Sequence, residues 1–176
     1  LALSRHLHKA DSSMKKGEWD RKKFEGSELR GKIVGIIGLG NVGKIIARIM
    51  RGFNAVIYGY DPFVSEAAAR ELGIKLVGLE ELYRNSDYIT IHVPLNDKTR
   101  NMISKKEFDI MKKGIRIANV GRGGLINEND LHDALAENKV AGAAIDVWES
   151  EPPKDYRLAM HENVLATPHL GASTEE

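Results

Sequence analysis

The chain has 176 residues, of which 42% are apolar and 29% are charged, and its formal net charge is +1. This composition suits one globular domain, and the small net charge gives no general electrostatic reason to expect nucleic acid or an anionic membrane as partner. No apolar run reaches the roughly 20 residues that a membrane-spanning helix needs. Cysteine is absent, which excludes disulfides and thiolate metal sites and fits a reducing compartment, so we expect a cytoplasmic protein.

The N-terminal part of the chain predicts a helix followed by a linker. Residues 1–16 place Leu3, Leu7 and Met14 roughly on one helical face. Residues 17–31 form a charged connector. The chain starts with leucine rather than methionine, and its last residues, "PHLGASTEE", contain no helix or strand pattern. We therefore expect a piece of a longer polypeptide.

Between residues 33 and 166, short apolar runs alternate with helical patterns. Expected strands cover 33–37, 55–60, 74–77, 88–93, 115–120, 141–147 and 163–166, and expected helices cover 41–51, 65–72, 79–84, 104–112 and 127–138. The strands are continuously apolar, as in a parallel sheet that is covered on both faces. The alternation predicts an α/β fold with a doubly wound parallel sheet, whose ligands bind beyond the carboxyl ends of the strands.

A glycine-rich turn follows the first expected strand. Gly38, Gly40 and Gly43 form G-x-G-x-x-G directly before a helix. The first glycine permits a tight turn, the second lets a pyrophosphate approach the backbone, and the third lets the helix pack closely on the strand. About 20 residues later the next strand ends at Asp61, where a carboxylate can bind the ribose hydroxyls and repel a 2′-phosphate. Together these features predict binding of NAD rather than NADP.

The lysine after the glycines permits another interpretation. Gly38 to Lys44 also reads G-x-x-x-x-G-K, the start of a nucleoside triphosphate loop, which next requires serine or threonine to hold magnesium. Position 45 is Ile45, which cannot bind a metal. We therefore expect Lys44 to be a solvated residue of the first helical turn.

Three polar residues follow the later strands. Arg122 follows "IANVG", Glu151 follows "AIDVWES" and His169 follows "VLATP", each beside glycine or proline. A histidine can take a hydroxyl proton near neutral pH, a carboxylate can orient it, and an arginine can hold a substrate carboxylate. This set suits hydride transfer between nicotinamide and a 2-hydroxy or 2-oxo acid. Asp146, at another strand end, could accept from the carboxamide side of the cofactor.

The other histidines predict no metal site. His6 and His8 lie two positions apart on the expected helix and so point in different directions. We expect the remaining ones to be structural or exposed: His92, His132 and His161.

With these motifs in view, the chain resembles the D-isomer-specific 2-hydroxyacid dehydrogenases. The resemblance rests on "GIIGLGNVGKIIA", "YGYDPF", "IHVPLNDKTRNMI", "IANVGRGGLINENDL", "GAAIDVWESEPP" and "NVLATPHLGAST", in the order of the family. It implies the Rossmann-type cofactor domain of a two-domain enzyme, with 1–30 as hinge helix and connector, 31–168 as NAD-binding domain and 169–176 as the start of the return hinge. It also implies a homodimer or higher homo-oligomer.

The resemblance further implies roles for individual residues. Arg122 would bind substrate, His169 would be the acid/base and Glu151 its partner. NAD contacts would come from Gly38, Gly40, Asn41, Val42, Gly43, Asp61, Val93, Pro94, Gly121, Arg122, Asp146, His169, Gly171 and Ala172. Gly121 stands where the family often has alanine, and Glu151 stands where formate dehydrogenases of the family have glutamine.

Within the family, "MKKGEWDRKKFEGSEL" and "PHLGAST" are most similar to members that oxidise 3-phospho-D-glycerate to 3-phosphohydroxypyruvate, the first step of serine biosynthesis. Two alternatives remain open at this point. One is a glyoxylate or hydroxypyruvate reductase with the same residues. The other is an NAD-sensing interaction protein, similar to transcriptional corepressors of this fold, although the Arg122, Glu151 and His169 set favours catalysis.

Overall fold

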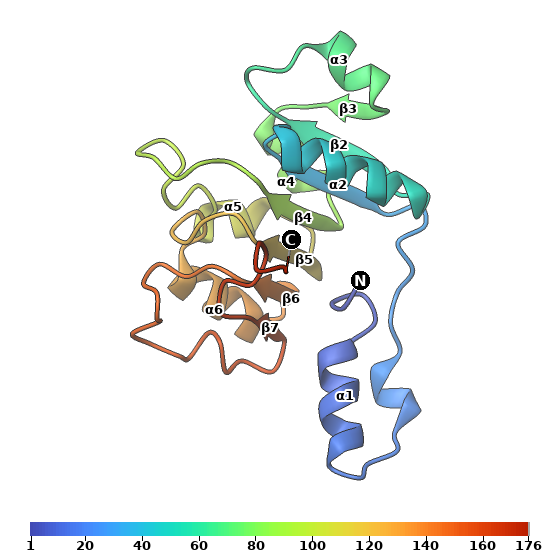
Figure 1. Cartoon of the computed structure of the whole chain (residues 1–176), viewed down its shortest axis with the longest axis vertical. Coiled ribbons are helices and arrows are strands. Elements are labelled where there is room, and N and C mark those ends of the chain that lie inside the picture. The colour runs from blue at the N-terminus through green and yellow to red at the C-terminus, as the bar shows by residue number, and fades with distance from the viewer. Residues whose placement is uncertain (176) are drawn as a thin grey trace.

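A computed structural model describes residues 1–175 and contains one seven-stranded parallel sheet (Figure 1). The strand order is β3-β2-β1-β4-β5-β6-β7. The strands are β1 (Ile33–Ile37), β2 (Val56–Tyr60), β3 (Ile74–Leu76), β4 (Tyr88–Ile91), β5 (Ile115–Asn119), β6 (Val140–Ile145) and β7 (Val164–Ala166). The predicted doubly wound parallel sheet is confirmed.

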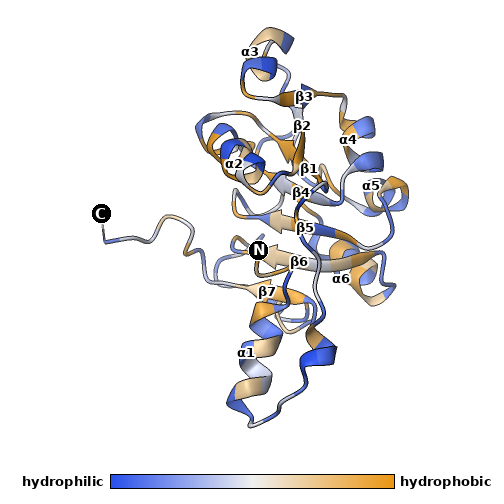
Figure 2. Ribbon diagram, turned by 90° about the vertical axis from the view of Figure 1, so that its right-hand side faces the viewer, coloured by the Kyte–Doolittle hydropathy of each residue, from blue (hydrophilic) through white to orange (hydrophobic). Residues whose placement is uncertain are grey.

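Helices lie on both faces of this sheet (Figure 2). One face carries α2 (Asn41–Gly52), and the other carries α4 (Leu79–Asn85), α5 (Lys105–Ile110) and α6 (Glu128–Ala136). The short α3 (Glu66–Glu71) lies beside β3 at one edge. Each predicted strand and helix between residues 33 and 166 is present, with ends that lie within two residues of the prediction. Within residues 1–175, no helix is both long and apolar enough to pass through a bilayer.

The N-terminal helix is shorter than predicted. It begins as α1 (Leu7–Lys15) because His6 has φ 51°, a left-handed conformation that does not continue a right-handed helix. Its expected apolar face is not covered, since Leu7 is 54% and Met14 53% exposed. With the 3-10 turn η1 (Arg21–Phe24), α1 extends beyond the β7 edge of the sheet (Figure 2). Lys9 Nζ of α1 donates to Asn163 Oδ1, directly before β7. The last residue of the predicted return hinge, Glu176, lies outside the described residues.

Capping residues mark the ends of two helices, α3 and α5. The Ser65 hydroxyl accepts the N–H of Ala68 at the start of α3, and Gly73 follows this helix with φ 66°. Glu107 closes a capping box on Ser104 at the start of α5. These caps were predicted from the sequence.

Two groups of buried side chains hold the layers together. The larger group lies between the sheet and α4, α5 and α6. The smaller group joins β1, β2 and β3 to α2 and α3 and includes Leu39, which is only 1% exposed although it lies between the first two glycines of the loop. A Cβ built on Gly59 of β2 would lie 2.9 Å from Leu39 Cδ1. The glycine loop is thus anchored in the core by its own leucine.

The strand order places the site. The chain runs outward from β1 through β2 to β3, then returns to the other side of β1 with β4 and continues to β7. In such sheets the crevice at the reversal, here beyond the carboxyl ends of β1 and β4, is the usual place for a ligand.

Candidate active site

The loops beyond the strand ends touch one another along this edge. A Cβ built on Gly38, after β1, would lie 2.5 Å from the carbonyl oxygen of His92, after β4. One built on Gly123, after β5, would lie 1.8 Å from the carbonyl oxygen of Trp148, after β6. These distances leave no space for side chains. A Cβ built on Gly121, after β5, would lie 2.9 Å from the carbonyl oxygen of Ile91 at the end of β4. The loops after β1, β4, β5 and β6 therefore form one continuous rim.

The glycine loop has the shape of a phosphate cradle. Gly38 has φ 94°, and a Cβ on Gly43 would lie 2.0 Å from the Gly38 carbonyl oxygen, so both positions require glycine. Nothing lies within 4 Å of a Cβ built on Gly40, which is the N-cap of α2 and has no side chain to bond the first helical turn. Since no side chain caps the first turn of α2, its amide groups are available to bind an anion.

Asp61 lies directly after β2 and faces the glycine loop. Its Oδ2 accepts the N–H of Leu39 at 2.8 Å, and its Oδ1 accepts the N–H of Phe63 at 2.9 Å. A carboxylate oxygen can accept more than one hydrogen bond, so these contacts fix the group while leaving acceptor capacity for ribose hydroxyls. The contact between Asp61 and the glycine loop was not predicted, and the binding of ribose hydroxyls by Asp61 stays a prediction.

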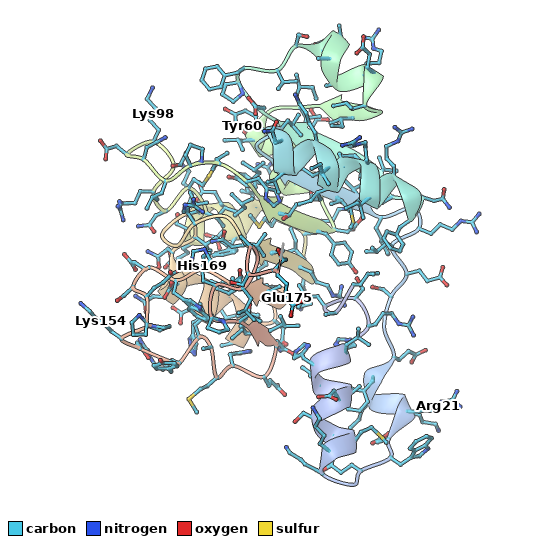
Figure 3. The ribbon with its side chains drawn as sticks, viewed as in Figure 1. Arg21, Tyr60, Lys98, Lys154, His169 and Glu175 are labelled. Atoms are coloured by element: carbon cyan, nitrogen blue, oxygen red, sulfur yellow. The ribbon has the colours of Figure 1, made fainter. Side chains whose placement is uncertain are left out.

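His169 and Glu151 form a direct pair. The two atoms His169 Nδ1 and Glu151 Oε2 are 2.8 Å apart, and both side chains are a little over 40% exposed. Glu151 is also held by the N–H of Trp148, which donates to its Oε1 at 3.1 Å. The backbone of His169 has φ 57°, and its backbone N–H donates to the Asp146 carbonyl oxygen at 2.8 Å. The sequence places these two residues on separate loops, and the fold brings them into contact. Figure 3 labels His169.

Hydrogen bonds keep Glu151 in its charged form. The bond from His169 and, after it, the bond from the Trp148 N–H lower the pKa of the Glu151 carboxyl group, while slight desolvation opposes them. An anionic Glu151 can only accept a hydrogen bond, so Nδ1 of His169 carries the hydrogen and donates it to Glu151 Oε2. The lone pair of the neutral ring is then on Nε2.

Asp146 anchors the loop that carries His169. The carboxylate is in a residue only 5% exposed, and it accepts bonds from Thr167 Oγ1 at 2.5 Å, from the Leu170 N–H at 2.7 Å and from the Gly171 N–H at 2.8 Å. Burial alone would raise the pKa of Asp146, but the three bonds outweigh it and the pKa is lowered. Both carboxylate oxygens of Asp146 thus bind the loop, and its contact with the cofactor stays a prediction.

Arg122 projects from a tight loop after β5. The buried Asn119 shapes this loop by accepting the Gly121 N–H at 3.2 Å and donating to the Arg122 carbonyl oxygen at 2.9 Å. The exposed guanidinium donates from Nη1 to the Gly121 carbonyl oxygen at 2.7 Å. Arg122 is thus on the same rim as the pair, with its charge accessible to an anionic ligand.

The remaining predicted cofactor contacts lie on the same edge. Asn41 and Val42 form the first turn of α2, and both are exposed. A Cβ on Gly38 would also approach Val93 Cγ1 at 2.9 Å, which places the Val93–Pro94 turn against the glycine loop. Ala172 is exposed, one residue beyond the Gly171 N–H that Asp146 binds.

A cavity of about 430 Å³ opens beside the pair. Its lining includes Glu151 and His169 and is otherwise mainly apolar, from Trp148, Pro152, Pro153, Tyr156, Ala159, Ala166, Thr167 and Pro168. The imidazole therefore has an apolar surface on one side. No group of three or more histidine, aspartate or glutamate side chains within residues 1–175 is arranged to hold a metal ion.

Three residues that shape the site were not predicted from the sequence: Thr167, Trp148 and Glu128. The Thr167 hydroxyl donates to Asp146. Trp148 donates from its backbone N–H to Glu151 and from Nε1 to the Thr167 carbonyl oxygen, the latter at 3.1 Å. Glu128 accepts the N–H of Glu149 at 2.6 Å. Glu128 has one sequence signal, an acidic residue in the first turn of a helix, which usually reflects only the helix dipole.

A family model agrees with this geometry over almost the whole chain. The model of the D-isomer specific 2-hydroxyacid dehydrogenase NAD binding domain matches residues 1–171. The chain belongs to this family. NAD, the cofactor in the family description, fits the residues present. The unobstructed space at Gly40, the N-terminus of α2 and the Asp61 carboxylate offer the contacts that a dinucleotide needs.

Known proteins of the family are similar to the chain in sequence and in fold. The D-3-phosphoglycerate dehydrogenase of Methanocaldococcus jannaschii is 48% identical over the whole chain, which covers 34% of that protein. A glyoxylate reductase from Paecilomyes thermophila superposes with TM-score 0.92 at 33% identity, over 99% of this chain and 53% of that one. A D-lactate dehydrogenase from Aquifex aeolicus, complexed with NAD and lactic acid, superposes with TM-score 0.91 at 27% identity, over 99% and 57%. The chain spans about a third of the length of the curated relatives it matches.

Proposed function

We propose that the chain is the NAD-binding part of a D-2-hydroxyacid dehydrogenase whose substrate is 3-phospho-D-glycerate, which it oxidises to 3-phosphohydroxypyruvate. The observation that carries the reaction class is the 2.8 Å contact between His169 and Glu151 on the rim that also carries the glycine loop. The substrate is supported by the identity of 44–48% to D-3-phosphoglycerate dehydrogenases across the whole chain.

The residues of the chain divide the chemistry between them. When bound, NAD would accept the hydride from the carbon that bears the hydroxyl group. His169 takes the hydroxyl proton on Nε2 while its Nδ1–H remains bonded to Glu151, which favours the imidazolium that forms. Arg122 holds the substrate carboxylate through paired N–H bonds. In the reverse direction the imidazolium returns its proton to the carbonyl oxygen.

The organisation of the whole protein belongs to the same proposal. Residues 1–30 would be the hinge helix and connector, 31–168 the NAD-binding domain, and 169–176 the start of a return hinge to a substrate-binding domain. We further propose a homodimer or higher homo-oligomer in the cytoplasm. Because the groups that recognise the far end of the substrate would lie in the second domain, the 176-residue chain alone should bind NAD weakly and turn over little.

The alternative within the family is a glyoxylate or hydroxypyruvate reductase, which the glyoxylate reductase fold match supports. Steady-state kinetics of the full-length protein decide between the two. The experiment compares kcat/KM for 3-phosphoglycerate, glycerate, glycolate and D-lactate in oxidation, and for 3-phosphohydroxypyruvate, hydroxypyruvate and glyoxylate in reduction. A preference of at least tenfold for the phosphorylated acids supports the proposal, and equal or better rates with the unphosphorylated acids overturn the substrate.

A further inference from the structure

The first residue of α6 touches the loop that carries Glu151. Glu128 Oε1 accepts the N–H of Glu149 at 2.6 Å. The preceding amide, Trp148, donates to Glu151 Oε1 at 3.1 Å. Two successive N–H groups therefore each bind a carboxylate, one from α6 and one from the pair with His169.

The peptide unit between Trp148 and Glu149 is also enclosed by backbone. A Cβ built on Gly123 would lie 1.8 Å from the Trp148 carbonyl oxygen and 2.8 Å from the Glu149 nitrogen. This peptide thus lies between the loop that carries Arg122 and the carboxylate of Glu128. The Trp148 N–H that donates to Glu151 belongs to the adjoining peptide unit, one Cα away. Fixing the Trp148–Glu149 unit therefore restricts ψ of Trp148 and limits how far this N–H can turn from Glu151.

The surroundings of Glu128 are unfavourable for a charge. Partial burial raises the pKa of its carboxyl group, the nearby carboxylates of Glu149 and Asp155 add to this, and only the bond from the Glu149 N–H opposes them. Among the ion pairs of the described residues, none includes Glu128. Within residues 1–175, the hydrogen bond that its side chain makes is the one to the N–H of Glu149, in the loop of the acid/base pair.

We propose that Glu128 is a positioning residue for the reaction: by fixing the Trp148–Glu149 peptide, it keeps Glu151 oriented toward His169. This inference rests on the proposed function of the pair. Its requirement is an acceptor oxygen at the position of Glu128 Oε1, not a negative charge.

Three variants in the full-length protein separate these requirements. Glu128→Ala removes the acceptor, Glu128→Asp keeps the charge but shortens the side chain, and Glu128→Gln keeps the acceptor without the charge. We expect kcat to fall about 10- to 30-fold in the first two, with KM for the acid changing less than about threefold, because a lost hydrogen bond to a charged group acts here on the chemical step. Glu128→Gln should retain kcat within about threefold. Glu137→Ala, at the exposed far end of α6, is the matched control and should behave as the wild type.

A second measurement on the 176-residue chain does not depend on activity. NMR should show faster exchange of the Glu149 amide proton in Glu128→Ala, and a rise in the pKa of the Glu151 carboxyl group toward its ordinary value, with neither change in Glu128→Gln. Unaltered exchange and unaltered Glu151 titration in Glu128→Ala would overturn the inference, as would equal losses of kcat in the Ala and Gln variants. If the wild-type full-length protein oxidises no 2-hydroxy acid, the proposed function fails, while the NMR result still decides whether Glu128 holds the loop.

Discussion

The clearest test of the site concerns Asp146, whose carboxylate ties the loop of His169 to the end of β6. In Asp146→Asn the side chain keeps its shape, but its NH₂ group replaces one acceptor oxygen and faces a donor. At least one of the bonds from Thr167, Leu170 and Gly171 is then lost. A hydrogen bond to a charged group contributes about 1.5–3 kcal/mol, and the exposed loop amides can recover part of this from water.

We therefore expect Asp146→Asn to lower the free energy of unfolding by about 2 kcal/mol at pH 7, which corresponds to a fall in Tm of about 4–8 °C for a chain of this size. Urea unfolding followed by circular dichroism measures this directly. Asp97→Asn makes the same chemical change at an exposed loop position and should alter the unfolding free energy by less than about 0.5 kcal/mol.

The pH dependence gives the sharper result. Since the pKa of Asp146 in the folded chain is lower than its ordinary 3.8, its stabilising effect is fully present above that value and is lost as the pH falls through the folded pKa. The stability difference between wild type and Asp146→Asn should therefore stay constant near neutral pH and shrink once the pH falls below 3.8. Equal stabilities at pH 7, or a difference that does not diminish in acid, would refute the role of Asp146 as the loop anchor.

Four further outcomes are expected. Gly43→Ala should destabilise the fold by about 2 kcal/mol or more and abolish NAD binding, because its Cβ would lie 2.0 Å from the Gly38 carbonyl oxygen, as thermal unfolding and calorimetry can show. Gly40→Ala, with open space at its Cβ, should leave stability within about 1 kcal/mol of wild type yet weaken NAD binding at least about tenfold; an unchanged affinity would mean that no phosphate approaches this residue. Asp61→Ser should loosen NAD and reduce the preference over NADP, measured as a ratio of the two dissociation constants, and a constant ratio would assign the discrimination to another group. His169→Ala in the full-length protein should lower kcat by about 10²-fold or more, and unaltered turnover would remove His169 from proton transfer.

The sequence predicted those parts of the molecule that depend on local chemistry. The apolar runs and the caps at Ser65, Ser104 and Asn127 gave the strands and helices within one or two residues, because each depends on neighbours in the chain. The predicted start of α1 was wrong because His6 adopts a left-handed conformation. Glycine and asparagine usually occupy such positions, and histidine gives no such signal in the sequence.

The site was predictable in its members but only partly in its contacts. Glu151 and His169 could be named because glycine or proline and a strand end mark each of them. Their 2.8 Å contact, the use of both Asp146 oxygens by the 167–171 loop, and the contact from Glu128 to Glu149 all join segments 18 to 25 residues apart. Contacts between segments so far apart in the sequence depend on tertiary packing, which the spacing of residues along the chain does not predict.

The buried side chain of Leu39 gives the dinucleotide site a second dependence, on the hydrophobic packing beneath it. The backbone N–H of Leu39 donates to Asp61, and its side chain packs beside Gly59 of β2. A cavity created next to this side chain would therefore let Leu39 shift, and the glycine loop would shift with it. Substitutions far from any cofactor atom, among the small apolar residues of that layer, can therefore alter coenzyme affinity. A mutational screen for binding should accordingly recover interior positions as well as the rim.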